Sequence, residues 1–294
     1  MRVVGCRSTL SSASDPKKKF EHVPRFCYRK CFSPILNTKI TSDKGWGCCF
    51  RCTQGIIGQF IYRLHNQYKT DYDRVFGQDC DPSSLFFDTP EAPFSIHNLV
   101  KNSIEFGLEP GTWAKPSIAA AAIQRIFGEL HLGCVLCHDF CITKSEMDIS
   151  FPAIFLVPGL FGLDSLDLSF IPFLHAAICI QGSLGFVSGK RNSAYYIAGL
   201  DSDKFIYFDP HTTMPALLRV EDKSSLFSIK PRTIRFRAIN PSILIGFMCT
   251  STSDLDNVIE TMMSINSSPI DVNEPSDAAM AQVLDIDDLD LDGE

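Results

Sequence analysis

The chain has 294 residues, 45% hydrophobic and 21% charged, which is enough to bury the core of one large domain or two small ones. Nine acidic residues lie within residues 271–294, which contain no Lys or Arg, so the rest of the chain carries a net charge of +2 rather than −7. This balance excludes a basic nucleic-acid-binding surface, and we expect no nucleic acid partner.

Twelve cysteines would suit a secreted disulfide scaffold, but Met1–Ser8 lacks the features of a signal peptide. We therefore expect reduced thiols and a cytoplasmic protein. The longest apolar run, residues 151–163, is interrupted by Pro152 and Pro158 and is too short to cross a bilayer.

The N-terminal third contains one strong helical pattern. Residues 1–10 are compatible with a short strand, and the spacing of aromatic residues in 24–35 fits a strand or a helix equally well. A glycine turn at 45–47 precedes an apolar helical pattern that runs to about Tyr68. Residues 71–93, rich in Asp, Pro and Gly, predict a surface loop.

Helices and strands alternate in the middle of the chain. Ser95 begins a predicted helix that ends at Gly107, and a turn at 110–113 presents Trp113. Ser117 is the predicted N-cap of an alanine-rich helix that runs to Ile126. The apolar runs 131–142 and 151–157 predict strands, the second of them central and buried.

The C-terminal half predicts mainly antiparallel strands. Residues 166–179 predict a helix with Pro172 in its first turn or at a kink. Three short strands separated by turns follow and form a meander, and two more strands and a closing helix complete the pattern. These segments are residues 184–187, 194–200, 204–208, 234–239, 244–248 and 253–264.

Composition changes near residue 266. From there to residue 294 the chain has no aromatic residue and many Asp, Ser and Pro residues, which predicts a disordered acidic tail. We therefore expect one domain over residues 1–265, with a small inserted subdomain around 125–180, followed by the tail.

The stretch Gly45–Cys52 places three thiols at the start of the first long helix. A thiol there lies near unpaired backbone N–H groups and the positive end of the helix dipole, which lower its pKa and favour the nucleophilic thiolate. Position alone leaves Cys48, Cys49 and Cys52 open as nucleophiles.

A thiol nucleophile needs an imidazole base and a group that orients it. Among the seven histidines, His211 stands out because it follows a predicted strand and lies two residues after Asp209, with Pro210 between them. In an extended Asp-Pro-His segment the carboxylate and the imidazole share one face. A turn with a solvated histidine is the competing interpretation.

Zinc binding is an alternative use of the cysteines. Cys49 and Cys52 have zinc-like spacing, and so do Cys134, Cys137 and Cys141 with His138. The second group also fits a strand whose thiols pack as small hydrophobic groups, and Arg51 is a poor neighbour for a cation. We expect no bound metal and no cofactor.

Several motifs together resemble those of the autophagin family, cysteine peptidases that process the ubiquitin-like autophagy modifier. The resemblance extends from about residue 3 to about residue 260, and the motifs agree in order and spacing. They are Gly-Trp-Gly-Cys-x-x-Arg-Cys at 45–52, Tyr-Phe-Asp-Pro-His-Thr-Thr at 207–213, Tyr-Arg-Lys at 28–30, Ser-Leu-Gly at 183–185, Gly-Lys-x-Asn-Ser-Ala at 189–194, and Asn-Pro-Ser-Ile at 240–243 with Gly-Phe at 246–247.

The resemblance implies an α+β, papain-like fold with the catalytic helix packed on an antiparallel sheet. It assigns Cys48 as the nucleophile, His211 as the general base and acid, and Asp209 as the orienting carboxylate. Tyr28 occupies the position whose hydroxyl helps to bind the oxyanion, together with the backbone N–H of Cys48.

The resemblance also implies a gated, narrow site. Trp113 matches a tryptophan that covers the scissile bond, and Gln181, Gly182 and Ser183 match a mobile loop that faces it. The implied substrate is the modifier, both as a precursor cut after its C-terminal glycine and as a conjugate with phosphatidylethanolamine. We expect a monomer that meets autophagic membranes only transiently, through this substrate.

Three positions depart from the family pattern: Cys49 adjoins the expected nucleophile, Tyr195 stands where a histidine is common, and Arg191 replaces a usual proline. The long insertion that some relatives carry ahead of residue 151 is also absent. A non-catalytic modifier-binding protein of the same fold and a reversible disulfide among the three clustered thiols are further alternatives. Residues 20–23 fit a modifier-docking motif formally, although lysines precede it where acids are preferred.

Overall fold

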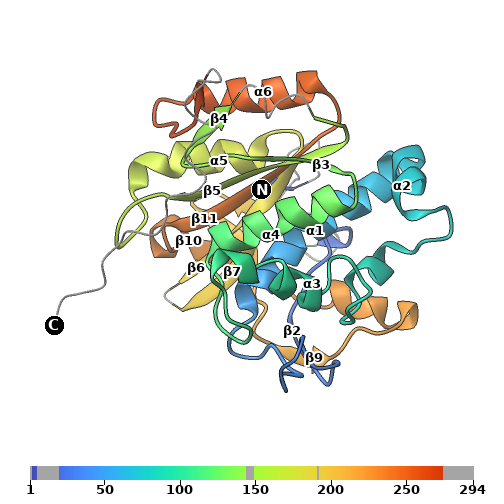
Figure 1. The fold of residues 1–294 in the computed structure, drawn as a ribbon. Coiled ribbons are helices and arrows are strands. Elements are labelled where there is room, and N and C mark those ends of the chain that lie inside the picture. Colours follow the sequence, from blue (N-terminus) through green and yellow to red (C-terminus); the bar gives the residue numbers. More distant parts are fainter. Residues whose placement is uncertain (1, 5–19, 144–148, 191, 274–294) are drawn as a thin grey trace.

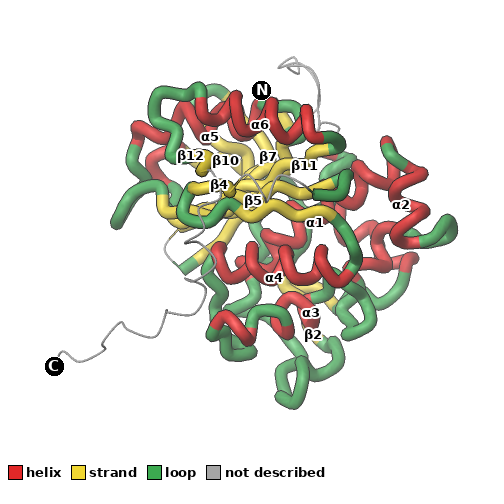
Figure 2. Tube along the Cα trace, turned by 45° about the horizontal axis from the view of Figure 1, so that its top comes forward, coloured by secondary structure: helices red, strands yellow, loops and turns green. Residues whose placement is uncertain are grey.

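The protein consists of a central sheet with helices on both faces (Figure 1). The computed structural model describes residues 2–4, 20–143, 149–190 and 192–273. Helices α1 (Cys48–Gln67) and α4 (Pro116–Glu129) pack on one face, and α5 (Ile171–Cys179) and α6 (Thr252–Met263) lie on the other (Figure 2). This arrangement confirms the expected α+β class.

The central sheet is mostly antiparallel. Its strand order is β10-β8-β7-β6-β11-β5-β3, with β1 paired to β7, and only the β3–β5 pairing is parallel. The strands are β1 (Arg2–Val3), β3 (Gly133–Leu136), β5 (Ala153–Leu160), β6 (Ser183–Lys190), β7 (Ser193–Asp201), β8 (Lys204–Phe208), β10 (Arg232–Arg235) and β11 (Ser242–Cys249).

Two small parallel ladders lie beside this sheet. One joins β2 (Tyr28–Lys30) to β9 (Thr213–Pro215), and the other joins β4 (Cys141–Thr143) to β12 (Asp271–Asn273). The remaining helices are α2 (Lys69–Phe76), α3 (Ile96–Lys101) and short 3-10 helices at Pro82–Phe86, Ile104–Phe106, Leu168–Phe170, Val220–Phe227 and Phe236–Ala238.

The pattern-based predictions hold best where the sequence signal is local. The β6–β7–β8 meander and the closing helix form as expected, and Pro172 lies in the first turn of α5. The apolar run from residue 153 becomes β5, which pairs with β11 and β3 in the interior of the sheet. A strand covered by helices on both faces needs apolar side chains on both faces, which explains its continuous hydrophobicity.

Close packing of α1 on the sheet depends on two glycines. A Cβ at Gly55 would lie 2.8 Å from the ring of Tyr196, and one at Gly58 would lie 2.8 Å from Pro24. Both contacts are shorter than real Cβ contacts, so a larger side chain would push the helix away from β7 or from the N-terminal segment. The glycines thus set how deeply α1 is buried.

Several local expectations are wrong. Residues 71–93 contain most of α2 and a 3-10 helix instead of a plain loop. Lys115, not Ser117, is the N-cap of α4, because Pro116 suits the first helical position. The predicted strand 131–142 is divided into β3 and β4 by a turn in which Asp139 and Phe140 have positive φ.

The predicted domain boundaries also need correction. The segment 125–180 supplies β3 and β5 to the central sheet, so its described residues are not a separate subdomain. Ile270 is buried and β12 pairs with β4, so the ordered part extends through residue 273 instead of ending at 265. The rest of the predicted tail, residues 274–294, lies outside the described residues.

The formal docking motif at residues 20–23 can be compared with the burial of its side chains. Phe20 and Val23, the apolar anchors of the formal docking motif, are both buried and therefore cannot bind a partner in this structure.

Among the described residues, no helix combines the length and apolarity needed to traverse a bilayer.

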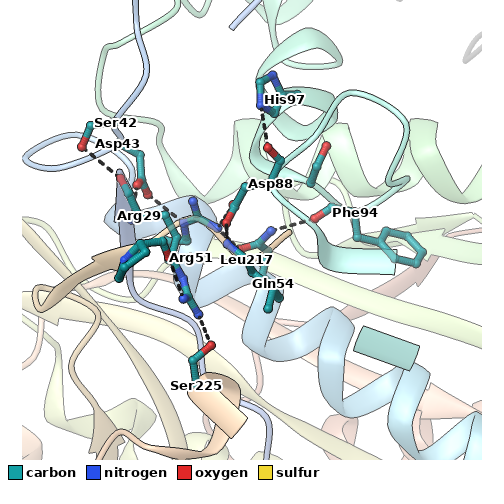
Figure 3. A network of polar contacts seen from close by, with 12 residues as sticks. Arg29, Ser42, Asp43, Arg51, Gln54, Asp88, Phe94, His97, Leu217 and Ser225 are labelled. Atoms are coloured by element: carbon teal, nitrogen blue, oxygen red, sulfur yellow. Dashed lines mark hydrogen bonds and ion pairs between the residues drawn. The ribbon is translucent and has the colours of Figure 1, made fainter. Parts of the chain in front are cut away.

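A buried ion cluster fixes the start of α1 (Figure 3). The guanidinium of Arg51 donates from Nε to Asp43 Oδ2 at 2.7 Å and from Nη1 to Asp88 Oδ1 at 2.8 Å. Asp43 also accepts from the backbone N–H of Arg29 at 2.6 Å, and Asp88 accepts from that of Leu217 at 2.7 Å. Four chain segments are thereby tied together one helical turn from Cys48.

This cluster predicts a large loss of stability for Asp88→Ala. The substitution would leave Arg51 buried with one carboxylate partner and would orphan the N–H of Leu217, so the free energy of unfolding should fall by about 3–5 kcal/mol. Urea denaturation measures the change. Asp79→Ala, at an exposed aspartate, should change stability by less than about 0.5 kcal/mol. Equal losses in the two variants would show that the cluster does not stabilise the fold.

Candidate active site

Cys48 is the first residue of α1 and lies under the surface, with 1% of its area exposed. The preceding turn is formed around Asp43, whose carbonyl accepts from the N–H groups of Trp46 and Gly47. A Cβ at position 47 would lie 2.5 Å from the carboxylate of Asp43, so only glycine fits there. The glycine turn therefore delivers the thiol to the helix start, as the sequence predicts.

His211 reaches the same place from the other end of the chain. It follows β8, and the segment after it pairs with β2, where Tyr28 N–H donates to Pro210 O at 2.8 Å. The rings of Tyr28 and His211 meet edge to face with centroids 5.3 Å apart. This short parallel ladder brings Tyr28 and His211 together at the N-terminus of α1.

Asp209 holds the imidazole. Its Oδ1 accepts from Nδ1 of His211 at 2.6 Å and from the backbone N–H of His211 at 3.1 Å. The opposite ring nitrogen is thus left to face the thiol, and the side chains of His211 and Cys48 are hydrogen-bonded. The structure thus brings the side chains of Cys48, His211 and Asp209 together in that order, an arrangement that suits nucleophilic catalysis by a thiol.

The ionisation of the thiol reflects two opposing effects. Burial raises the pKa of Cys48, but hydrogen bonds from His211, the N–H of Ala194, Trp113 and Tyr28 outweigh it and lower the pKa below the ordinary value. A buried thiol with several donors is a stabilised thiolate.

The pKa of His211 is shifted in the opposite direction, upward. The hydrogen bond to Asp209, followed by that to Cys48, raises the pKa of His211 to about 9. The same bond to His211 lowers the pKa of Asp209. These shifts favour the charged form of each group, that is, a thiolate, an imidazolium and a carboxylate.

Trp113 covers the thiol. Its indole Nε1 donates to Cys48 Sγ at 3.3 Å, and 42% of the side chain remains exposed. Beside it lies a groove of about 190 Å³ between α4 and the β6–β7 hairpin. The groove is lined by Trp113, Pro116, Val187, Ser188, Gly189, Lys190, Asn192, Ser193, Ala194, Asn240 and Ser242.

Comparison with known proteins agrees with this geometry. The sequence model of the peptidase C54 catalytic domain matches residues 13–261, most of the chain. The chain belongs to the peptidase C54 family.

Curated relatives of this C54 chain carry the name cysteine protease ATG4. The protein from Medicago truncatula is 30% identical over 269 residues, which cover 78% of this chain and 55% of the relative. ATG4b from Arabidopsis thaliana is 29% identical, covering 82% and 59%, and ATG4B from Xenopus laevis is 27% identical, covering 79% and 71%. The chain thus spans less than two thirds of the two plant relatives. This result confirms the family inferred from the motifs.

The neighbouring thiols of the C54 site have different environments from Cys48. Cys49 and Cys52 are buried, and burial raises the pKa of both. Hydrogen bonds from four groups lower the pKa of Cys48, whereas at Cys49 the effect of burial prevails. The structure favours Cys48 among the three thiols left open by position, and gives its neighbours a packing role.

The zinc alternative finds no support in the described residues. Cys134 lies in β3, where burial raises its pKa, and His138 and Cys141 close a turn by backbone pairing. Nowhere in residues 2–4, 20–143, 149–190 and 192–273 do three or more His, Cys, Asp or Glu side chains gather as metal ligands would.

The expected position of the gating loop is wrong. Gln181 and Gly182 precede β6 at the end of the strand remote from the thiol, and Arg63 of α1 donates to Ser183 O. Arg63 lies about 22 Å along the helix from Cys48. Gly182 has φ +94°, and its carbonyl accepts from Met248 N–H at 2.8 Å, so glycine serves a close backbone contact there. The end of β6 that lines the groove beside Trp113 is Gly189–Lys190.

Sequence reasoning also missed two groups in the site. The N–H of Ala194, at the start of β7, donates to the Cys48 thiol, and Arg232 Nη1 donates to Asp209 Oδ2 at 3.0 Å. The motif at 189–194 was a signal for the first of these. No local pattern marks Arg232, because its place follows from the pairing of β10 with β8.

The indole hydrogen bond gives a prediction for Trp113→Phe. The variant keeps an aromatic cover but loses the N–H donor, so the pKa of Cys48 should rise by about 0.5–1 unit. The measurement is the rate of alkylation by iodoacetamide between pH 4 and 8, compared with Cys48→Ala to isolate the signal of this thiol. Phe106→Leu, at an aromatic of equal exposure, should leave the profile unchanged. A Trp113→Phe profile that coincides with wild type would contradict the assignment.

Proposed function

We propose that this chain is a cysteine endopeptidase that cuts the precursor of the ubiquitin-like autophagy modifier after its C-terminal glycine and releases the modifier from phosphatidylethanolamine. The observation that carries the proposal is the chain of contacts from Cys48 through His211 to Asp209 at the start of α1. Membership of the C54 family and the names of the relatives support it.

The arrangement performs acyl transfer in two steps. The Cys48 thiolate attacks the carbonyl carbon of the substrate glycine, and the oxyanion accepts hydrogen bonds from the Cys48 N–H and from Tyr28. Burial and the Cys48 charge raise the pKa of Tyr28, so its hydroxyl remains a donor. The imidazolium of His211 then protonates the departing amine, and water activated by the neutral imidazole hydrolyses the thioester.

The two proposed substrates need no difference in chemistry. In both, the glycine carboxyl is bonded to nitrogen as an amide, and the leaving group is either a peptide amine or the ethanolamine headgroup. The groove beside Trp113 admits a thin, extended chain, which suits a flexible tail ending in glycine. We propose that the protein acts as a monomer in the cytoplasm and meets membranes only through the conjugate.

The alternative of a non-catalytic binding protein is weakened by the ionisation of the site. A protein that only bound the modifier would need neither a stabilised thiolate nor an imidazolium beside it. Binding and cleavage are separable, because a Cys48→Ala variant should keep the groove while losing the nucleophile.

Incubation of the modifier precursor with three forms of the protein tests the nucleophile. Cys48→Ala should lose at least about 10³-fold in kcat, since only the nucleophile forms the thioester. Cys49→Ala, one residue away and fully buried, should keep activity within about fivefold of wild type. Gel analysis of the product and thermal unfolding of each variant provide the readouts. Cleavage by Cys48→Ala with loss in folded Cys49→Ala would reverse the assignment, and no cleavage by folded wild type would reject the peptidase proposal.

The pH dependence of kcat/KM tests the base. The active form carries imidazolium, so activity should fall as pH rises through about 9, the pKa of His211. Asp209→Ala removes the largest cause of that raised pKa. The alkaline limit, meaning the pH above which kcat/KM falls, should therefore move down toward about 6.5–8. Asp203→Ala, at an exposed aspartate in the β7–β8 turn, should leave the limit in place. An unchanged or higher limit in Asp209→Ala would contradict the role of Asp209.

A further inference from the structure

Both carboxylate oxygens of Asp209 accept hydrogen bonds. Oδ1 accepts from the N–H and Nδ1 of His211, while Oδ2 accepts from Arg232 Nη1 at 3.0 Å. The thiol–imidazole mechanism uses only the first oxygen. Arg232 therefore makes a contact with the catalytic carboxylate that the proposed reaction leaves unexplained.

Strand register puts Arg232 in this place. Arg232 is the first residue of β10 and lies directly opposite Tyr207 of β8 in the antiparallel pairing. Side chains opposite each other, and those two residues further on, share a face of the sheet. Asp209 is two residues beyond Tyr207, so the diagonal neighbour of Arg232 is the catalytic carboxylate.

We propose that Arg232 is a positioning residue that locks the plane of the Asp209 carboxylate and shares its charge, so that His211 releases its proton more readily to the leaving amine. The inference rests on the proposed function, because it assigns Arg232 a role in the same acyl transfer.

The locking follows from geometry. His211 holds Oδ1 with two donors and Arg232 holds Oδ2, so the carboxylate cannot rotate and keep all three hydrogen bonds. With Oδ2 unbound, rotation about the Cβ–Cγ bond would misalign Oδ1 from Nδ1 of His211, and the opposite ring nitrogen would move relative to Cys48 Sγ. Misplacement of a reacting group by even a fraction of an ångström lowers the rate.

The charge sharing follows from Coulomb's law. Arg232 remains cationic over the accessible pH range and lowers the pKa of Asp209. A positive charge at Oδ2 weakens the attraction between Asp209 and the proton on His211, and it also repels the imidazolium directly. Both effects oppose the rise in the His211 pKa, so removing the charge should raise that pKa further.

Few other groups can titrate near His211. Tyr28 of β2 and Tyr195 of β7 meet its ring edge to face, and burial raises the pKa of both hydroxyls. Cys48 is the direct partner of the imidazole, and Cys52 in the next turn of α1 has a pKa raised well above the ordinary value by burial. A change in the His211 pKa caused by Arg232 can therefore be distinguished from the titration of these neighbours.

The test compares Arg232→Gln and Arg232→Lys with Arg235→Gln, which removes the same charge from the exposed far end of β10. The pKa of His211 is read by NMR of protein labelled with ¹³C at histidine Cε1, with His211→Asn used only to assign the signal. Arg232→Gln should raise this pKa by about 0.3–0.6 unit, as expected for an exposed ion pair, and Arg232→Lys should stay within about 0.2 unit of wild type. In 1 M NaCl the difference between Arg232→Gln and wild type should fall below about 0.2 unit, because the Debye length is then about 3 Å.

Turnover provides the second readout. With the modifier precursor as substrate, Arg232→Gln should lower kcat by about two- to fivefold with little change in KM, and should move the alkaline limit of kcat/KM upward by the same amount as the NMR shift. A shift in Arg232→Gln no larger than that in Arg235→Gln, or an Arg232→Lys variant as shifted as Arg232→Gln, would overturn the proposal. The NMR titration needs no substrate, so it tests Arg232 even if the chain cuts no modifier precursor.

Discussion

Burial of charge beneath the Cys48 thiol is the constraint on which the rest of the site depends. Arg51 lies one turn along α1 from Cys48 and is 1% exposed, and its partners Asp43 and Asp88 are fully buried. Arg29, also buried, brings the cluster to two charges of each sign. Charges removed from water are costly unless they are paired or hydrogen-bonded, and the Arg29 guanidinium is held by Pro215 O and Ser225 Oγ. The chain segments that carry them therefore have one mutual arrangement, and that arrangement places β2, the α1 turn and the segment after β9 around the thiol.

The contrast between Cys48 and Cys49 shows what makes a buried thiol reactive. Both are almost completely buried, so desolvation acts on both and raises the pKa of each. The difference is the number of donors, because Cys48 faces His211, Tyr28, Trp113 and a backbone N–H. Position at a helix start therefore does not distinguish adjacent thiols; the direction in which each side chain points does. That direction is fixed by the turn before α1, which needs glycine at position 47.

Sequence patterns predicted the elements whose signal is local. Alternation and turn residues gave the β6–β7–β8 meander. Local pattern left three thiols open, and the family resemblance singled out Cys48, His211 and Asp209, which the structure brings together. Predictions failed where the outcome depends on distant pairing. Residues 266–273 have a composition typical of disorder but are ordered because β4 offers an edge to pair with. The family resemblance places Gly182 in a mobile loop, whereas here the glycine permits a close backbone contact with Met248. Arg232 has no local signature, since only the register of β10 on β8 places it beside Asp209.

Side chains of alternating charge run from the surface to the buried thiol, in the order Arg232, Asp209, His211, Cys48. The outer guanidinium is 64% exposed, while Cys48 is 1% exposed. Salt screens exposed charges strongly and buried ones weakly, so ionic strength acts on the outer pair and leaves the thiolate–imidazolium contact nearly intact. A change at the surface can thus alter how tightly His211 holds its proton without disturbing the nucleophile. In the proposed reaction His211 gives this proton to the leaving amine, so proton delivery is the step on which we expect surface charge near Asp209 to act.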